Sequence, residues 1–235
     1  MDTKYLITTR PEIKFNKIRT ENIKIINFPL TVMVNIKLSE ECINRIKTED
    51  PDIIILTSSY GAELFFNNYY IYVKKPVFIP VGDRTLDVIR RYTDNYIIPD
   101  EKDSYGIIDL IKKYGNKKIA LFRSKKSNNI LRNSLKDNNY NFHEYYIYDI
   151  EGIYNDKILE LLNNNNCTGI FFTSSLEADI FFDILKNNRI KKNIFAIGKI
   201  TEKTIIDHGY NVNFTGNSNF EETVREIDKN SGEWI

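Results

Sequence analysis

A segment that the chain carries twice constrains the fold more than any other feature of the sequence. The first copy begins LTSSYGAELFF at Leu56 and continues as VFIPVGDRTLDVI from Val77. The second begins FTSSLEADIFF at Phe172 and continues as IFAIGKITEKTII from Ile194. At a constant offset of 116 positions the copies are identical at Thr57, Ser58, Ser59, Ala62, Phe65, Phe66, Lys75, Gly82, Thr85 and Ile89. This duplication predicts two similar lobes.

Short apolar runs alternate with amphipathic stretches along the whole chain. Ile53–Leu56, Lys118–Phe122 and Gly169–Phe172 are continuous apolar runs, which are typical of strands buried inside a parallel sheet. The alternation predicts an α/β fold in which each lobe is a flavodoxin-like parallel sheet flanked by helices. A helix is also expected over residues 11–21, directly after the strand Lys4–Thr9.

Composition excludes several classes of partner. The net charge of 235 residues is only +1, so no overall field attracts nucleic acid or a membrane surface. The first apolar run is too short for a signal peptide, and no stretch reaches the ~20 apolar residues of a membrane helix. Two distant cysteines, Cys42 and Cys167, indicate neither a disulfide nor a zinc site, and favour a cytoplasmic protein.

The TSS and GxxT segments of both copies fall where a strand ends and a helix begins. In parallel sheets ligands bind at this edge, and helix N-termini offer free N–H groups and a positive dipole end to anions. The predicted binding residues are Thr57, Ser58, Ser59, Gly82, Thr85, Thr173, Ser174, Ser175, Gly198 and Thr201. Basic residues on the same edges could add local positive charge: Arg10, Arg84, Arg123, Lys125 and Lys199. For each segment read alone, helix capping and a tight turn are the better explanation.

A tyrosine cluster in the stretch FHEYYIYDI is the other candidate for chemistry. Strand alternation predicts that Tyr146 and Tyr148 point to one face and Tyr145 to the other. These rings could simply pack, or one phenol could donate a proton to a leaving oxygen. The sequence lacks a dinucleotide fingerprint and a phosphate-binding P-loop, and neither His143 nor His208 has a partner at metal-ligand spacing.

In order along the chain, the motifs resemble those of the uroporphyrinogen-III synthase family. The resemblance covers nearly the whole sequence and is carried by Thr9-Arg10-Pro11, Leu56–Ser59, Gly82–Thr85, Tyr148 in YIYDI, Phe172–Ser175, Gly198–Thr201 and Gly209–Val212. It implies a cyclising lyase of tetrapyrrole (heme, siroheme or cobalamin) biosynthesis that needs no cofactor and no metal. The substrate would be hydroxymethylbilane, which is closed to uroporphyrinogen III with inversion of ring D and loss of water.

The resemblance also implies residue roles and partners. Tyr148 matches the family's tyrosine and would help the terminal hydroxyl of the substrate to leave. The doubled TSS and GxxT segments would hold the substrate's carboxylates. A cytoplasmic monomer is expected, with transient contact to the deaminase that produces the bilane and no contact with nucleic acid or membrane.

The duplication alone suggests lobes 1–115 and 116–235, but the resemblance implies a different division. Lobe one would comprise residues 1–34 and 152–235, and lobe two residues 35–151. Extended runs over 32–37 and 146–151 would cross between the lobes and allow them to close. The alternative from another class is a two-lobed protein that binds or senses a small anion without catalysis.

Overall fold

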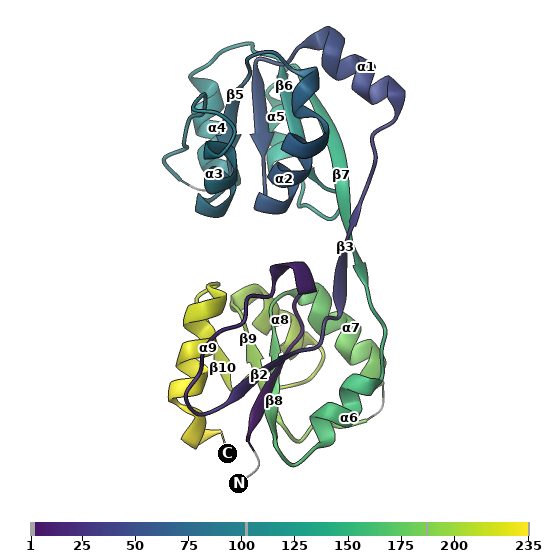
Figure 1. The fold of residues 1–235 in the computed structure, drawn as a ribbon, viewed down its shortest axis with the longest axis vertical. Helices are drawn as coiled ribbons and strands as arrows, with labels where there is room; N and C mark the ends of the chain where they lie inside the picture. The colour runs from purple at the N-terminus through teal and green to yellow at the C-terminus, as the bar shows by residue number, and fades with distance from the viewer. Residues whose placement is uncertain (1–2, 102, 187, 235) are drawn as a thin grey trace. The chain divides into compact units, whose positions relative to one another are not determined.

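The computed structural model describes residues 3–101, 103–186 and 188–234, and the chain forms two compact units. Unit one is Met1–Met33 with Glu151–Ile235, and unit two is Val34–Ile150. The boundaries predicted from the sequence differ from these by one residue. Figure 1 shows that each unit has its own sheet and its own helices.

Unit one is built on a parallel sheet with strand order β10-β9-β8-β1-β2. Its strands are β1 (Tyr5–Thr8), β2 (Lys24–Asn27), β8 (Cys167–Phe172), β9 (Asn193–Ala196) and β10 (Phe214–Thr215). Its helical segments are the 3-10 turn η1 (Glu12–Lys14), α6 (Lys157–Asn163), α7 (Ser175–Leu185), α8 (Lys199–Asp207), α9 (Phe220–Lys229) and the 3-10 turn η3 (Ser231–Glu233).

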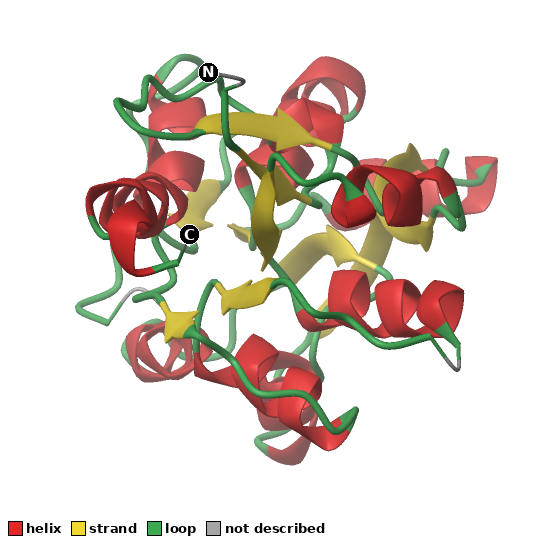
Figure 2. Ribbon diagram, turned by 90° about the horizontal axis from the view of Figure 1, so that it is seen from below, coloured by secondary structure: helices red, strands yellow, loops and turns green. Residues whose placement is uncertain are grey.

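Both faces of this sheet are buried, which explains why its strands are continuous apolar runs. Ile7, Ile170 and Phe172 point to a core shared with α6, α7 and α8. Leu6 and Phe171 point to the opposite core, which α9 covers. Figure 2 shows the helices in red around the yellow strands.

Unit two repeats this plan with strand order β3-β7-β6-β4-β5. Its strands are β3 (Thr31–Asn35), β4 (Ile53–Leu56), β5 (Val77–Pro80), β6 (Ile119–Ser124) and β7 (Phe142–Gly152). Its helical segments are α1 (Glu40–Glu49), α2 (Ser59–Asn68), the 3-10 turn η2 (Tyr70–Tyr72), α3 (Asp83–Arg90), α4 (Ser104–Lys112) and α5 (Ile130–Asp137). The predicted α/β fold with two helix-flanked, mainly parallel sheets is therefore confirmed.

Each face of the second sheet also has its own helices. Ile55 and Leu121 pack with α4 and α5 on one face. On the other face, Phe65 of α2 lies edge-on to Phe78 and Phe122, with ring centroids 5.7 and 4.7 Å apart. Because α2 covers one face of the sheet, only strand residues that point to that face can reach its first turn.

β3 and β7 are the two strands that run from one unit into the other. Within unit two, the Ile36 N–H donates to the Ile147 carbonyl at 2.9 Å. Within unit one, the Ile153 N–H donates to the Leu30 carbonyl at 2.8 Å. The runs predicted to cross between lobes overlap these paired strands.

The helix predicted over residues 11–21 is wrong. Only η1 is helical there, and the chain then continues without regular structure. Phe15 and Ile18 pack instead against the core beneath α9, where the Phe15 ring lies edge-on to Phe220 at 6.4 Å. Tertiary packing has overridden the local helical preference.

Candidate functional site

In unit two, Ser58 links the end of β4 to the start of α2. It is the N-cap of α2, and its hydroxyl accepts a hydrogen bond from the Gly61 N–H at 3.0 Å. The same oxygen lies 2.8 Å from the hydroxyl of Tyr148 on β7. The two strongest candidates from the sequence, the first TSS segment and the mid-chain tyrosine, therefore meet in one contact.

The side chain of Tyr148 is held against the first turn of α2. Only 4% of the residue is exposed, and its ring lies edge-on to Tyr60 at a centroid distance of 5.1 Å. Burial raises the pKa of Tyr148, and the hydrogen bond from Ser58 offsets part of that rise. The phenol is therefore neutral at physiological pH and has a proton to donate.

The predicted alternation of the three tyrosines is wrong, because β7 carries an irregularity beside β6. Arg123 pairs with Tyr146, but the next residue of β6, Ser124, pairs with Tyr148, so one residue of β7 is left over. A bulge of this kind turns the residues after it to the opposite face. Tyr148 consequently faces α2, on the same side as Tyr145, whose ring stacks on Phe122 at 4.9 Å.

Tyr146 lies on the other face and belongs to a separate polar cluster. Its hydroxyl donates to Glu144 at 2.6 Å, and the buried guanidinium of Arg123 pairs with the same carboxylate at 3.1 Å. Arg123 was a candidate source of positive charge for the site. Its charge is instead neutralised within the unit.

At α3, the predicted GxxT segment is shaped mainly by the requirements of the turn. Gly82 has φ = 80°, which favours glycine, and it precedes the helix as its N-cap. Thr85 is buried, and its hydroxyl donates to the Val81 carbonyl at 2.8 Å. Gly82 and Thr85 can therefore offer a ligand only their backbone N–H groups.

In unit one, the second TSS segment is arranged differently from the first. Ser174 is the N-cap of α7 and accepts a hydrogen bond from the Glu177 N–H at 3.3 Å. The N–H and the hydroxyl of Thr173 both bind the Glu177 carboxylate, each at 2.9 Å. Ser175 begins the helix, and its buried Oγ has no hydrogen-bond partner among the described residues.

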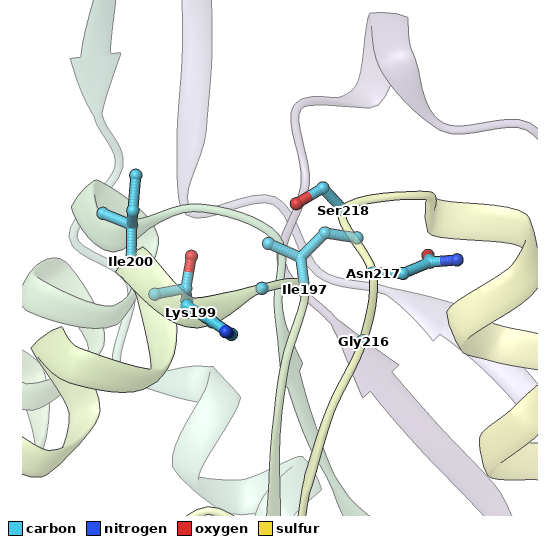
Figure 3. Close-up of a pocket in the computed structure, with 8 residues that line it drawn as sticks. Ile197, Lys199, Ile200, Gly216, Asn217 and Ser218 are labelled. Atoms are coloured by element: carbon cyan, nitrogen blue, oxygen red, sulfur yellow. The ribbon is translucent and has the colours of Figure 1, made fainter.

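A pocket of about 480 Å³ lies at the N-terminus of α8. It is lined by the second GxxT segment, Gly198 to Thr201, together with Ile197 and the loop Gly216–Ser218. Figure 3 shows Ser218 of this loop beside the side chain of Ile197, with Ile200 at the start of α8 on one side and Asn217 on the other. The residues that line the pocket include the first turn of α8, the basic residue Lys199 and the apolar Ile197 and Ile200, a combination that suits an anion carried on an apolar ring.

The loop Gly216–Ser218 was not predicted from the sequence, since it matches no motif. Ser218 has φ = 72°, and its N–H donates to the Ile197 carbonyl at 2.7 Å. A Cβ on Gly198 would lie 2.7 Å from the Ser218 hydroxyl, so any other residue at 198 would require that hydroxyl to rotate away. The positive φ of Ser218 leaves no mark on its sequence, because serine is not a residue that indicates a left-handed conformation.

The described residues include neither a metal cluster nor a membrane-spanning helix. No group of three or more histidine, cysteine, aspartate or glutamate side chains among them is placed to hold a metal ion. None of their helices is both long and apolar enough to span a bilayer.

Comparison with known proteins points to one family. The family model described as HEM4, uroporphyrinogen-III synthase HemD, matches residues 16–219. No curated protein matches the sequence significantly.

Solved structures show the same fold at low sequence identity. Uroporphyrinogen-III synthetase from Helicobacter pylori 26695 aligns with a TM-score of 0.69 at 12% identity, covering 96% of this chain and 98% of its own. A mutant uroporphyrinogen III synthase from the extremely thermophilic bacterium Thermus thermophilus aligns with a TM-score of 0.64 at 10% identity, covering 98% and 100%.

Proposed function

This chain belongs to the uroporphyrinogen-III synthase family, and we propose that Tyr148 and the helix N-termini of its two units carry out the family's reaction. The reaction closes hydroxymethylbilane to uroporphyrinogen III with inversion of ring D and loss of water. The enzyme is thus a cyclising lyase of tetrapyrrole biosynthesis. The alternative of a non-catalytic anion-binding protein is not favoured by the family match.

We assign to Tyr148 the role of the acid that starts the reaction. Its proton passes to the terminal hydroxyl of the substrate. The C–O bond then breaks, so that water leaves and an azafulvene cation remains. A pyrrole carbon that already carries a substituent then attacks, giving a spiro intermediate that fragments and recombines with ring D inverted. Loss of a proton restores the aromatic pyrrole, and Tyr148 recovers its proton.

The observation that carries this assignment is the 2.8 Å contact between the hydroxyls of Tyr148 and Ser58. Since Ser58 already accepts from the Gly61 N–H, it can still donate its own proton to the phenol oxygen. Such a donor stabilises the phenolate that forms when the proton is transferred. Tyr148 would keep this hydrogen bond from Ser58 and donate its own proton to the leaving oxygen when the substrate binds.

The substrate's carboxylates are held, in this proposal, at helix N-termini. Thr57, Ser58 and Ser59 contribute at α2, Gly82 and Thr85 at α3, and Gly198 and Thr201 at α8. The pocket beside α8 supports the last assignment most directly, because Lys199 and the apolar Ile197 line it together. At α7, Ser174 and Ser175 lie at the first turn, while Thr173 is bonded to Glu177.

Holding a linear tetrapyrrole in a folded conformation accounts for much of the expected rate enhancement, because positioning replaces a search among conformers. We further propose that the enzyme acts as a cytoplasmic monomer and receives its unstable substrate by transient contact with the deaminase.

The test is the identity of the product. The protein is coupled to a bilane-producing deaminase, and the porphyrin isomers are separated after oxidation. A shift from isomer I to isomer III, dependent on the amount of protein, is expected. Accumulation of isomer I at the uncatalysed rate in the presence of folded protein would refute the proposed function.

A further inference from the structure

Glu177 and Gly61 occupy the same position in the two copies of the duplicated segment, 116 residues apart. Each is the third residue of its helix, α7 and α2 respectively. Each donates its N–H to the serine that caps the helix. The copies therefore share their caps but differ at this third position, where α7 carries a carboxylate and α2 carries no side chain.

The Glu177 side chain is buried, with 2% of the residue exposed. Its Oε2 accepts from the Thr9 hydroxyl at 2.7 Å, from the Thr173 N–H at 2.9 Å and from the Thr173 hydroxyl at 2.9 Å. Its Oε1 lies 3.1 Å from the same Thr173 hydroxyl. These donors and the positive end of the helix dipole compensate the cost of burying the carboxylate.

This carboxylate has the environment that a bound anion would have at the end of β8. It lies at a helix N-terminus and uses the N–H and hydroxyl that the TSS segment provides. A second anion would have to displace it or share its donors against like-charge repulsion. In unit two the equivalent space beside Gly61 is taken by the Tyr148 ring, whose Cε1 lies 3.3 Å from where a Cβ on Gly61 would stand.

We propose that Glu177 is an internal anion that occupies the N-terminus of α7, so that this terminus binds no carboxylate of the substrate. Glu177 is a positioning residue: it joins the end of β1, through Thr9, to the end of β8, through Thr173. Resting on the proposed function, it follows that unit one holds the substrate at α8 and the loop Gly216–Ser218. The two TSS segments have thus divided their roles: the second serves the structure of unit one, and the first serves the reacting end of the substrate.

The test is chemical rescue of the variant Glu177→Ala. This substitution removes the CH2–COO⁻ part of the side chain and leaves a space the size of acetate. Thermal unfolding is followed in sodium acetate and in sodium chloride at equal ionic strength, and with neutral acetamide added. Acetate is expected to raise the unfolding midpoint of E177A by several degrees in a saturable manner, and acetamide is expected to have no such effect. If E177A is unfolded in chloride, recovery of a cooperative transition in acetate supports the proposal equally.

Glu222→Ala is the matched control. Glu222 is also the third residue of a capped helix, α9, but it is less buried than Glu177 and is bound by the side-chain amides of Asn217 and Asn219. Acetate should stabilise E222A no more than it stabilises the wild type. Equal responses of E177A, E222A and the wild type, or no recovery of E177A in acetate, would overturn the proposal.

The wild-type protein gives an independent reading by nuclear magnetic resonance. With Glu177 in place, the amide signal of Thr173 should not move saturably when acetate is added, whereas in E177A it should. A saturable shift of Thr173 in the wild type would contradict an occupied terminus. Neither measurement needs turnover, so failure of the isomer assay would leave this inference standing, and failure here would leave the isomer assay unaffected.

Discussion

At the scale of single residues, the neutral phenol of Tyr148 gives the most direct prediction. Tyr148→Phe should lower kcat by about 100-fold or more, the usual effect of removing a general acid. The free energy of unfolding should change by less than about 1.5 kcal/mol, because one hydrogen bond is lost and Ser58 keeps its bond to the Gly61 N–H. Steady-state kinetics and denaturant unfolding measure the two effects separately.

Tyr146→Phe is the control for that experiment. Tyr146 lies two positions away but on the opposite face of β7, where it bonds to Glu144. The activity of Y146F should stay near that of the wild type. Full activity of Y148F, or equal losses in both variants, would remove Tyr148 from the proposed mechanism.

Tyr145 gives a prediction about alkaline pH. Burial raises its pKa from 10.0 to about 12. Above pH 10 the unfolded chain loses this proton while the folded protein keeps it, so stability is full below pH 10 and falls as the pH rises toward 12. A shift of that size corresponds to at most about 3 kcal/mol.

The variant Tyr145→Phe retains the ring that stacks on Phe122 but cannot ionise. Its free energy of unfolding should fall less than that of the wild type between pH 10 and 12, while the two remain similar at neutral pH. Denaturant melts at a series of pH values measure this difference. Parallel curves for the two proteins would assign the alkaline loss to other groups.

At the scale of elements, the first turn of α2 and the strand β7 should act as one unit. A Cβ on Gly61 would lie 3.1 Å from the Ser58 hydroxyl and 3.3 Å from the Tyr148 ring, so Gly61→Ala should push the phenol out of place. Alanine improves helix propensity by up to ~1 kcal/mol, which offsets the crowding, and stability should change little. The kcat of G61A should fall, because the phenol is displaced.

The double variant G61A/Y148F tests whether this effect acts through the phenol. If it does, the double variant should be about as active as Y148F alone, because the shared interaction is already lost. Independent, multiplying losses would show that Gly61 matters for another reason.

The elements also show what could be predicted from the sequence and what could not. The continuous apolar strands were predictable because both faces of each sheet are covered, and the TSS segments were predictable because the copies repeat. The face of the sheet to which Tyr148 points was not predictable, because the sequence pattern does not show the irregularity beside Arg123 and Ser124. The role of Glu177 was also hidden, because its partner Thr9 lies 168 residues away in the sequence.

At the scale of the whole molecule, the duplication has produced two units with different connectivity. Unit two is one continuous segment, Val34–Ile150, with helices on both faces of its sheet. Residues 34–150 expressed alone should therefore fold and unfold cooperatively, with a circular dichroism spectrum of an α/β protein. The fragment should lack synthase activity, because the pocket beside α8 belongs to unit one. A fragment without cooperative unfolding would show that unit two depends on unit one for its stability.

Unit one, by contrast, takes an internal strand of its sheet, β1, from the beginning of the chain. β1 pairs with β2 on one side and with β8 on the other, and β8 begins only at Cys167. At the usual speed of translation, β8 leaves the ribosome about 10–30 s after β1. During that interval unit two can complete its sheet, while the apolar side chains of Leu6 and Ile7 remain exposed to solvent on the nascent chain. We therefore expect a chaperone that binds exposed apolar segments to act on the N-terminal strands during synthesis.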